Sequence, residues 1–262
     1  MYCVVYYGFG KKYLAYQNTD EEVTYGYYLT DRETFLMNLS NNKFKILYVE
    51  DESNIRSFVV INLRRSGFEP IEAETGEQAL EICEALHVAA DRVLFSGVNK
   101  TLADIEHAMD AGVIRFTAES PLHIRLLHEA AAARGRVYPV LLRLTAGTQF
   151  GMDESDLLAA IEHRADYPFL HFEGIHYFSG TQRAKLDKDQ RKELVMLSDL
   201  IGRLKADYGF DCEKIEYGPG LYFPYFAHED HSDTLAPIRE LAPDLKKLSE
   251  KCHLTIEMGR FF

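Results

Sequence analysis

Hydrophobic and polar positions follow two alternating patterns from residue 45 onward. Short apolar runs rich in β-branched and aromatic residues predict strands, and longer stretches with apolar residues at helical spacing predict helices. The expected strands cover residues 45–49, 69–73, 92–98, 113–119, 138–145, 169–178, 214–218 and 254–259. The expected helices cover residues 54–66, 76–87, 102–110, 120–133, 154–164, 187–207 and 236–250.

This regular alternation predicts βα units with parallel strands, and therefore an α/β fold. Several strand runs are apolar throughout, as strands buried on both faces should be. The number of consecutive units favours a TIM (β/α)8-type barrel, because closure removes both sheet edges. The barrel is nearly complete and lacks the last helix. A doubly wound sheet is the alternative that the same alternation leaves open.

The first 43 residues form a lead-in segment of different character. They are rich in tyrosine and polar residues, with a strand expected at 23–29 and a short helix at 31–40. The chain closes with Arg-Phe-Phe directly after the last expected strand, which itself ends in Glu-Met-Gly. We therefore expect either a fragment of a longer protein or a fusion.

Composition limits the partners more than it limits the fold. The 262 residues are 47% hydrophobic, enough for a substantial core, and carry a formal net charge of −12. That charge argues against a nucleic-acid surface, although local donors can still bind an anion. The four cysteines lack metal-binding or disulfide spacing, and neither a signal peptide nor a run of ~20 apolar residues is evident. We expect a cytoplasmic protein that binds neither nucleic acid nor membrane.

Polar residues gather where the expected strands end, which is where TIM barrels place their active sites. Two loops are notable: His-Tyr-Phe-Ser-Gly-Thr-Gln at 176–182 and Gly-Pro-Gly at 218–220. Each alone reads as an ordinary turn, and Glu257 with Arg260 alone reads as an ion pair. Together they predict a phosphate site with an acid nearby. The strand-end residues are Glu50, Asp51, Glu74, Asn99, Glu119, Arg143, Thr145, His176, Thr181, Gly218, Gly220, Glu257 and Arg260.

Six segments from about residue 84 onward resemble one family in order and spacing. They are LFSGVNKT (94–101), FTAESPLHIRLL (116–127), LLRLTAGTQFGM (141–152), FEGIHYFSGTQ (172–182), YGPGL (217–221) and IEMGRFF (256–262). The family is that of the pyridoxal-phosphate (PLP) dependent ornithine, diaminopimelate and arginine decarboxylases, with an alanine-racemase-like barrel. Within this family the segments are similar to those of the diaminopimelate decarboxylases.

The resemblance implies PLP as cofactor and roles for the matching residues. Glu257 would bond the pyridine nitrogen and keep it protonated, which makes the ring an electron sink. The phosphate would be held by Arg260, Thr181, Gly218 and Gly220.

Two further positions carry the resemblance with changes. Arg143 would lie near the ring, and His176 matches the first histidine of the family's HxHxGSQ pattern. The second histidine, which stacks on the ring, is Phe178 here, and an aromatic face can still stack. Pro219 replaces a middle glycine and removes one N–H donor from the loop.

The first strand departs from the family at the position that matters most. In the family this strand carries the lysine that binds the cofactor covalently, within a Y-x-V-K-A-N pattern. Here the run is LYVEDES (47–53), and Glu50 occupies the lysine position. A carboxylate cannot condense with an aldehyde. Lys45 and Lys100 are not obvious substitutes, so no catalytic lysine is assigned.

Residues 44–83 resemble instead the first half of a response-regulator receiver domain. The apolar strand, the acidic pair Glu50 and Asp51, the helix and the Gly-Glu-Gln-Ala-Leu segment all match. In receivers such a pair binds Mg²⁺, and a residual site is conceivable here. The phosphate-accepting aspartate is missing, because the third strand offers Ser96 and Asn99. A recombination of two families explains this better than drift.

Three functions remain in competition. The leading one is an amino-acid decarboxylase barrel impaired by Glu50, without the C-terminal β-domain that family enzymes use. The second is a non-catalytic PLP- or phosphate-binding barrel, and the third is a receiver-like signalling module. The family resemblance implies a small amino-acid substrate and a homodimer, and we assign no metal to the site.

Overall fold

The computed structural model describes residues 2–6, 14–17, 45–49, 52–65, 68–86, 93–97, 99–183, 188–224 and 228–257. The chain divides into two compact units, residues 1–115 and 116–262. The first unit contains β1 (Tyr2–Tyr6), β2 (Leu14–Gln17), β3 (Lys45–Val49), α2 (Ser53–Arg65), β4 (Glu69–Ala73), α3 (Gly76–Ala85), β5 (Leu94–Phe95) and α4 (Leu102–Asp110).

The sheet of the first unit has the strand order β2-β1-β3-β4. Strand β1 runs antiparallel to β2 and parallel to β3, and β3 runs parallel to β4. Neither β1 nor β2 was expected from the sequence, where residues 2–6 read only as a short apolar run. The strand expected at 23–29 and the helix expected at 31–40 lie outside the described residues.

Helices cover both faces of this first sheet. Leu47 and Val49 of β3 belong to a buried cluster with α3, whereas Ile46 and Tyr48 belong to a separate cluster with α2. The α3 cluster also contains Ala73, Ala79 and Cys83, and the α2 cluster contains Val60 and Leu63. Because successive strand residues point to opposite faces, α2 and α3 lie on opposite sides of β3. This is the arrangement of a doubly wound sheet.

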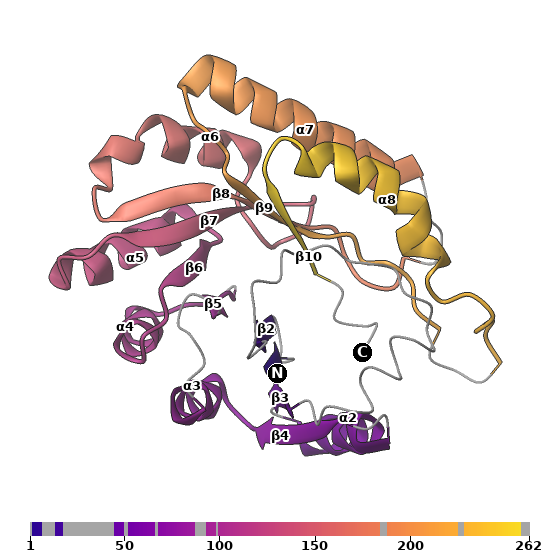
Figure 1. The fold of residues 1–262 in the computed structure, drawn as a ribbon. Helices are drawn as coiled ribbons and strands as arrows, with labels where there is room; N and C mark the ends of the chain where they lie inside the picture. Colours follow the sequence, from indigo (N-terminus) through magenta and orange to yellow (C-terminus); the bar gives the residue numbers. More distant parts are fainter. Residues whose placement is uncertain are drawn as a thin grey trace. The chain divides into compact units, whose positions relative to one another are not determined.

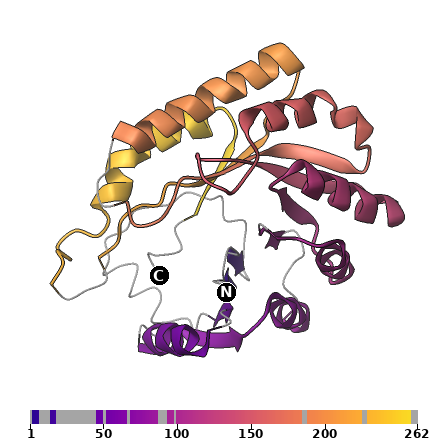
Figure 2. The ribbon, with the colours of Figure 1, turned by 180° about the vertical axis from the view of Figure 1, so that it is seen from behind.

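The second unit contains α5 (Pro121–Ala133), β7 (Tyr138–Leu144), α6 (Glu154–Glu162), β8 (Leu170–Phe178), α7 (Lys188–Tyr208), β9 (Lys214–Gly218), α8 (Ala236–Ser249) and β10 (His253–Ile256). Strand β6 (Arg115–Ala118) begins at the boundary. Strands β6 to β10 pair in sequence order and all run parallel. Helices α5 to α8 all lie on one face of this sheet (Figures 1 and 2), as the outer helices of a barrel do.

The sequence pattern accounts for this packing. Strand β7 is buried at every position except Pro139, in keeping with a parallel strand covered on both faces. Helix α7 buries one stripe, formed by Leu194, Leu197, Leu200 and Leu204, whose spacing follows the helical period. Truncating one such buried leucine to alanine costs about 2–5 kcal/mol of stability.

The start of helix α5 fixes the position of the residue that follows strand β6. The Ser120 side chain accepts a hydrogen bond from the His123 backbone N–H (3.2 Å), and Pro121 occupies the first turn. Both features are strong helix-start signals. Glu119 is therefore held between the end of β6 and the start of α5.

The strands and helices predicted from residue 45 onward are confirmed, with ends that differ by a few residues at most for every element except β5, which is shorter than expected. The α/β class and the barrel type are confirmed as a partial TIM-like barrel. Strand β3 lies between β1 and β4 in the described pairings. Within the described residues, none of the helices combines the length and apolarity that crossing a bilayer requires.

Candidate functional site

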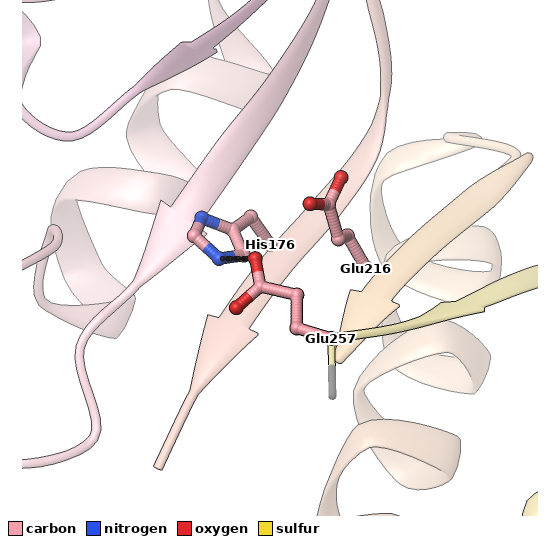
Figure 3. Close-up of side chains that lie close together, drawn as sticks. All are labelled: His176, Glu216 and Glu257. Carbon is pink, nitrogen blue, oxygen red and sulfur yellow. Dashed lines mark ion pairs between the residues drawn. The ribbon is translucent and has the colours of Figure 1, made fainter. Parts of the chain in front are cut away.

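Three ionisable side chains meet at the carboxyl ends of neighbouring strands. His176 lies on β8, Glu216 lies opposite it on β9, and Glu257 directly follows β10. One donor atom from each lies within 4.8 Å of the others. Figure 3 shows His176 and Glu257 pointing toward one another, with Glu216 beside them.

His176 is almost fully buried, with 3% of its surface exposed. Its Nε2 lies 3.0 Å from Oε1 of Glu257. Neither ring nitrogen makes a hydrogen bond of good geometry with the described residues. The contact between His176 and Glu257 is therefore an ion pair rather than an aligned hydrogen bond. Both ring nitrogens of His176 could still make hydrogen bonds of good geometry.

Burial and mutual repulsion set the charges of this cluster. Desolvation and the nearby Glu257 carboxylate raise the pKa of Glu216 to about 8. Burial alone would lower the pKa of His176, but the attraction of Glu257 and Glu216 outweighs it and raises that pKa. Two carboxylates this close, one buried and one half-buried, favour a proton or a positive partner, and His176 is one such partner for Glu257. The cluster therefore favours a bound cation or proton.

A second buried ion pair joins β7 to Glu119, the residue that directly follows β6. Nη1 of Arg143 donates to Oε2 of Glu119 at 3.0 Å, and both side chains are buried. The Arg143 guanidinium also lies 6.0 Å from the centre of the Phe178 ring and 5.6 Å from that of Phe150. Arg143 thus joins the aromatic side of the site to Glu119, with its charge already neutralised.

The glycine at position 218 lets these groups approach the backbone. A Cβ atom there would lie 2.2 Å from the Phe178 ring and 2.9 Å from Oε2 of Glu257. No real Cβ tolerates the first distance, so only glycine allows Phe178 and Glu257 to meet above β9.

The two loops predicted to bind phosphate lie side by side. The Ser179 N–H and hydroxyl both donate to the Gly218 carbonyl, at 3.1 and 3.2 Å. Gly220 has a φ of +62°, and a Cβ there would lie 2.3 Å from the Gly180 carbonyl oxygen. Thr181 is exposed on the first loop. The close approach therefore depends on glycine in the second loop.

Most of the predicted site residues are thus brought together. His176 contacts Glu257 beyond the end of β10, and the Arg143 guanidinium lies near the Phe178 ring. The adjoining loops contain Thr181, Gly218 and Gly220. Glu50, Asp51 and Arg260 lie outside the described residues.

The geometry can be set beside known proteins. Residues 53–262 match the model of a family described as "Pyridoxal-dependent decarboxylase, pyridoxal binding domain". This match covers most of the chain. The chain belongs to the pyridoxal-dependent decarboxylase family.

Curated relatives agree with this family. The chain is 32% identical over 178 residues to L-glutamyl-[BtrI acyl-carrier protein] decarboxylase of Niallia circulans, covering 62% of this chain and 40% of the relative. It is 28% identical over 197 residues to diaminopimelate decarboxylase of Zymomonas mobilis, covering 69% and 46%. The chain therefore spans less than half the length of these relatives.

Solved structures agree on the fold. Diaminopimelate decarboxylase of M. jannaschii in complex with L-lysine has a TM-score of 0.62 at 19% identity, covering 86% of this chain and 58% of that one. A structure described as SrLDC in complex with PLP and cadaverine has a TM-score of 0.63 at 19% identity, covering 87% and 57%. PLP is the cofactor of this decarboxylase family.

The residues present fit that cofactor. A pyridine N–H would add a positive partner beside the Glu216–Glu257 pair, and the glycines at 218 and 220 let Phe178, Glu257 and the Gly180 carbonyl lie close to the β9 strand and its loop. In chemical terms, the donors of His176, Glu216 and Glu257 could also hold a divalent cation. The family assignment favours the pyridine ring at this place.

Sequence reasoning missed three residues of this candidate site. Glu216 is buried within the apolar run of β9, and a carboxylate at such a position was a usable signal. Arg183 and Glu193 support the loops, but they are 10 residues apart and their contact depends on the tertiary fold.

Proposed function

We propose that this chain is the PLP-binding barrel of an amino-acid decarboxylase similar to diaminopimelate decarboxylase, in which the cofactor is held without a covalent lysine. The observation that carries this proposal is the cluster of buried His176 and Glu216 with half-buried Glu257. In that cluster Glu257 pairs with His176 and lies close to Glu216, and the protonated pyridine ring of the family's cofactor would be a further cationic partner for these carboxylates. When bound, PLP would draw electrons away from the carbon that loses CO₂.

Each residue then has a defined task. Glu257 would accept a hydrogen bond from the pyridinium, and Glu216 would carry the proton that keeps the pair at a single negative charge. Phe178 would pack against the ring, with the guanidinium of Arg143 beside it. The loops at 179–181 and 218–220 would bind the phosphate through the N–H groups of Gly180, Thr181 and Gly220, together with Arg260.

Covalent chemistry would be lost because Glu50 follows β3 at the lysine position. Without a lysine, the protein would have no amine that displaces the product from the cofactor aldehyde at the end of a cycle. Turnover would therefore be poor. A small amino acid as substrate and a homodimer as assembly follow from the family and belong to the same proposal.

Titration of the full chain with PLP tests this proposal. We expect a saturable change in PLP absorbance that inorganic phosphate reverses. Pyridoxal, which lacks the phosphate, should bind much more weakly, and Mg²⁺ or Zn²⁺ should not be needed. Absence of saturable PLP binding would contradict the proposal, and binding of Zn²⁺ in competition with PLP would favour the cation alternative.

A further inference from the structure

We infer that Glu193 and Arg183 form a clamp that positions both phosphate-binding loops through contacts with α7, without touching the phosphate. This inference rests on the proposed function, because it assigns the loops at 179–181 and 218–220 to phosphate. Glu193 lies on α7 and Arg183 ends the first loop. Their contact joins the helix layer to the site.

Both oxygens of the Glu193 carboxylate accept hydrogen bonds from other side chains of the protein. Oε1 accepts from Nη1 of Arg183 at 2.7 Å, and Oε2 accepts from the Tyr217 hydroxyl at 2.6 Å. Tyr217 is completely buried on β9, one residue before Gly218. A single carboxylate thus joins the base of the second loop to the end of the first.

Arg183 extends the clamp to the loops themselves. The same Nη1 also donates to the Ser179 hydroxyl at 2.8 Å, and the Arg183 backbone N–H donates to the Gly220 carbonyl at 2.9 Å. Ser179 in turn donates to the Gly218 carbonyl. The bonds from Glu193 to Gly218 and Gly220 are therefore continuous and run through Arg183 and Ser179.

A purely structural ion pair would not need this arrangement. The side chains of Arg183 and Glu193 are 23% and 14% exposed, so the charges are well shielded from water. Shielded, charge-assisted bonds are stronger and more directional than surface ones. They orient carbonyls and N–H groups of the two loops, which are the groups that define the width of an anion site.

The clamp predicts a loss that depends on the phosphate. The Glu193→Gln substitution keeps the shape but removes the charge that holds Arg183. We expect PLP affinity to fall about tenfold, the low end of the range for groups that orient ligands through others. Pyridoxal affinity should not change, and Tyr217→Phe should give a smaller loss of the same kind.

Glu154→Gln is the matched control. Glu154 also pairs with an arginine of α7, Arg203, at 2.8 Å, but both side chains are about half exposed and far from the loops in sequence. This variant should bind PLP and pyridoxal as the wild type does. The phosphorus NMR signal of bound PLP should move in Glu193→Gln and stay in place in Glu154→Gln.

The outcomes separate the clamp from the proposed function. Equal losses for PLP and pyridoxal in Glu193→Gln, or no loss for either, would overturn the clamp and leave PLP binding intact. A wild type that binds no PLP would overturn the proposed function. In that case weaker binding of inorganic phosphate by Glu193→Gln still supports the clamp, and unchanged or absent phosphate binding overturns it.

Discussion

The two units of this chain are built from the same alternation of strand and helix, yet they place their helices differently. In the first unit α2 and α3 lie on opposite sides of β3. In the second unit α5 to α8 all lie on one face of the sheet (Figure 1). The first arrangement is doubly wound and the second is barrel-like. The βα pattern alone does not distinguish them.

The same two units differ in how well they keep the features of a decarboxylase. The second unit holds the buried cluster, the glycine loops and the Arg143–Glu119 pair. The first unit ends its strand β3 at Val49, followed by Glu50 in place of a lysine. The proposed function therefore assigns cofactor recognition and covalent attachment to different units and predicts that only recognition is retained. The receiver-like interpretation of residues 44–83 stays a prediction.

The largest expected effect comes from restoring the missing amine. Glu50→Lys should convert reversible PLP binding into covalent attachment that borohydride fixes at position 50, directly after β3. Reduction followed by peptide mapping should find one equivalent there. If Glu50→Lys binds PLP but yields no adduct at that position, the assignment of Glu50 to the lysine position is wrong.

The second effect concerns recognition in the second unit. Glu257→Gln removes the anion that would face the pyridinium, and hydrogen bonds to charged groups contribute about 1.5–3 kcal/mol. We expect PLP affinity to fall by about 10- to 150-fold, measured by absorbance titration. Glu173→Gln, a substitution on the same sheet but before the carboxyl end of β8, serves as control. Unchanged affinity in Glu257→Gln would remove Glu257 from the site.

A smaller effect distinguishes the close packing of the two phosphate loops from the cost of a left-handed backbone conformation. Gly220 and Gly135 have nearly the same φ, +62° and +58°, but only Gly220 would place a Cβ against another backbone atom. Both alanine variants should lose about 1–2 kcal/mol of stability from the left-handed conformation. Gly220→Ala alone should weaken PLP binding, as measured by the same titration. Equal PLP affinity in the two variants would contradict the closely packed phosphate loops.

The smallest effect is a pH dependence of stability. The pKa of Glu216 is raised from 4.5 to about 8, so the folded chain holds a proton that the unfolded chain loses. The contribution of Glu216 to stability should therefore be fully present at and below about pH 4.5 and should be lost as pH rises toward 8. Denaturant unfolding at several pH values should show this decline, and Glu216→Gln should flatten it. A stability that rises over this range through Glu216 would refute the buried proton.

Much of this could be predicted from the sequence, for identifiable reasons. Strands such as Tyr138–Leu144 are apolar and bounded by turns, so periodicity located them. Glu257, Gly218 and Gly220 stood in recognisable motifs. The contacts of Glu193 and Glu216 depend on strand register and helix packing, which no local pattern encodes. The placement of α2 and α3 on opposite sides of β3 could not be predicted from the hydrophobic pattern. Strand β3 is apolar toward both faces in a doubly wound sheet and in a barrel alike.

The most direct test of the central claim uses the unaltered chain. PLP is added to saturation, the sample is divided, and one part is reduced with borohydride before intact-mass measurement and peptide mapping. The account predicts saturable binding that phosphate reverses, with no stoichiometric adduct at any lysine after reduction. A stoichiometric adduct at one lysine, such as Lys100 or Lys45, would contradict it, because cofactor recognition and covalent attachment would then both be retained.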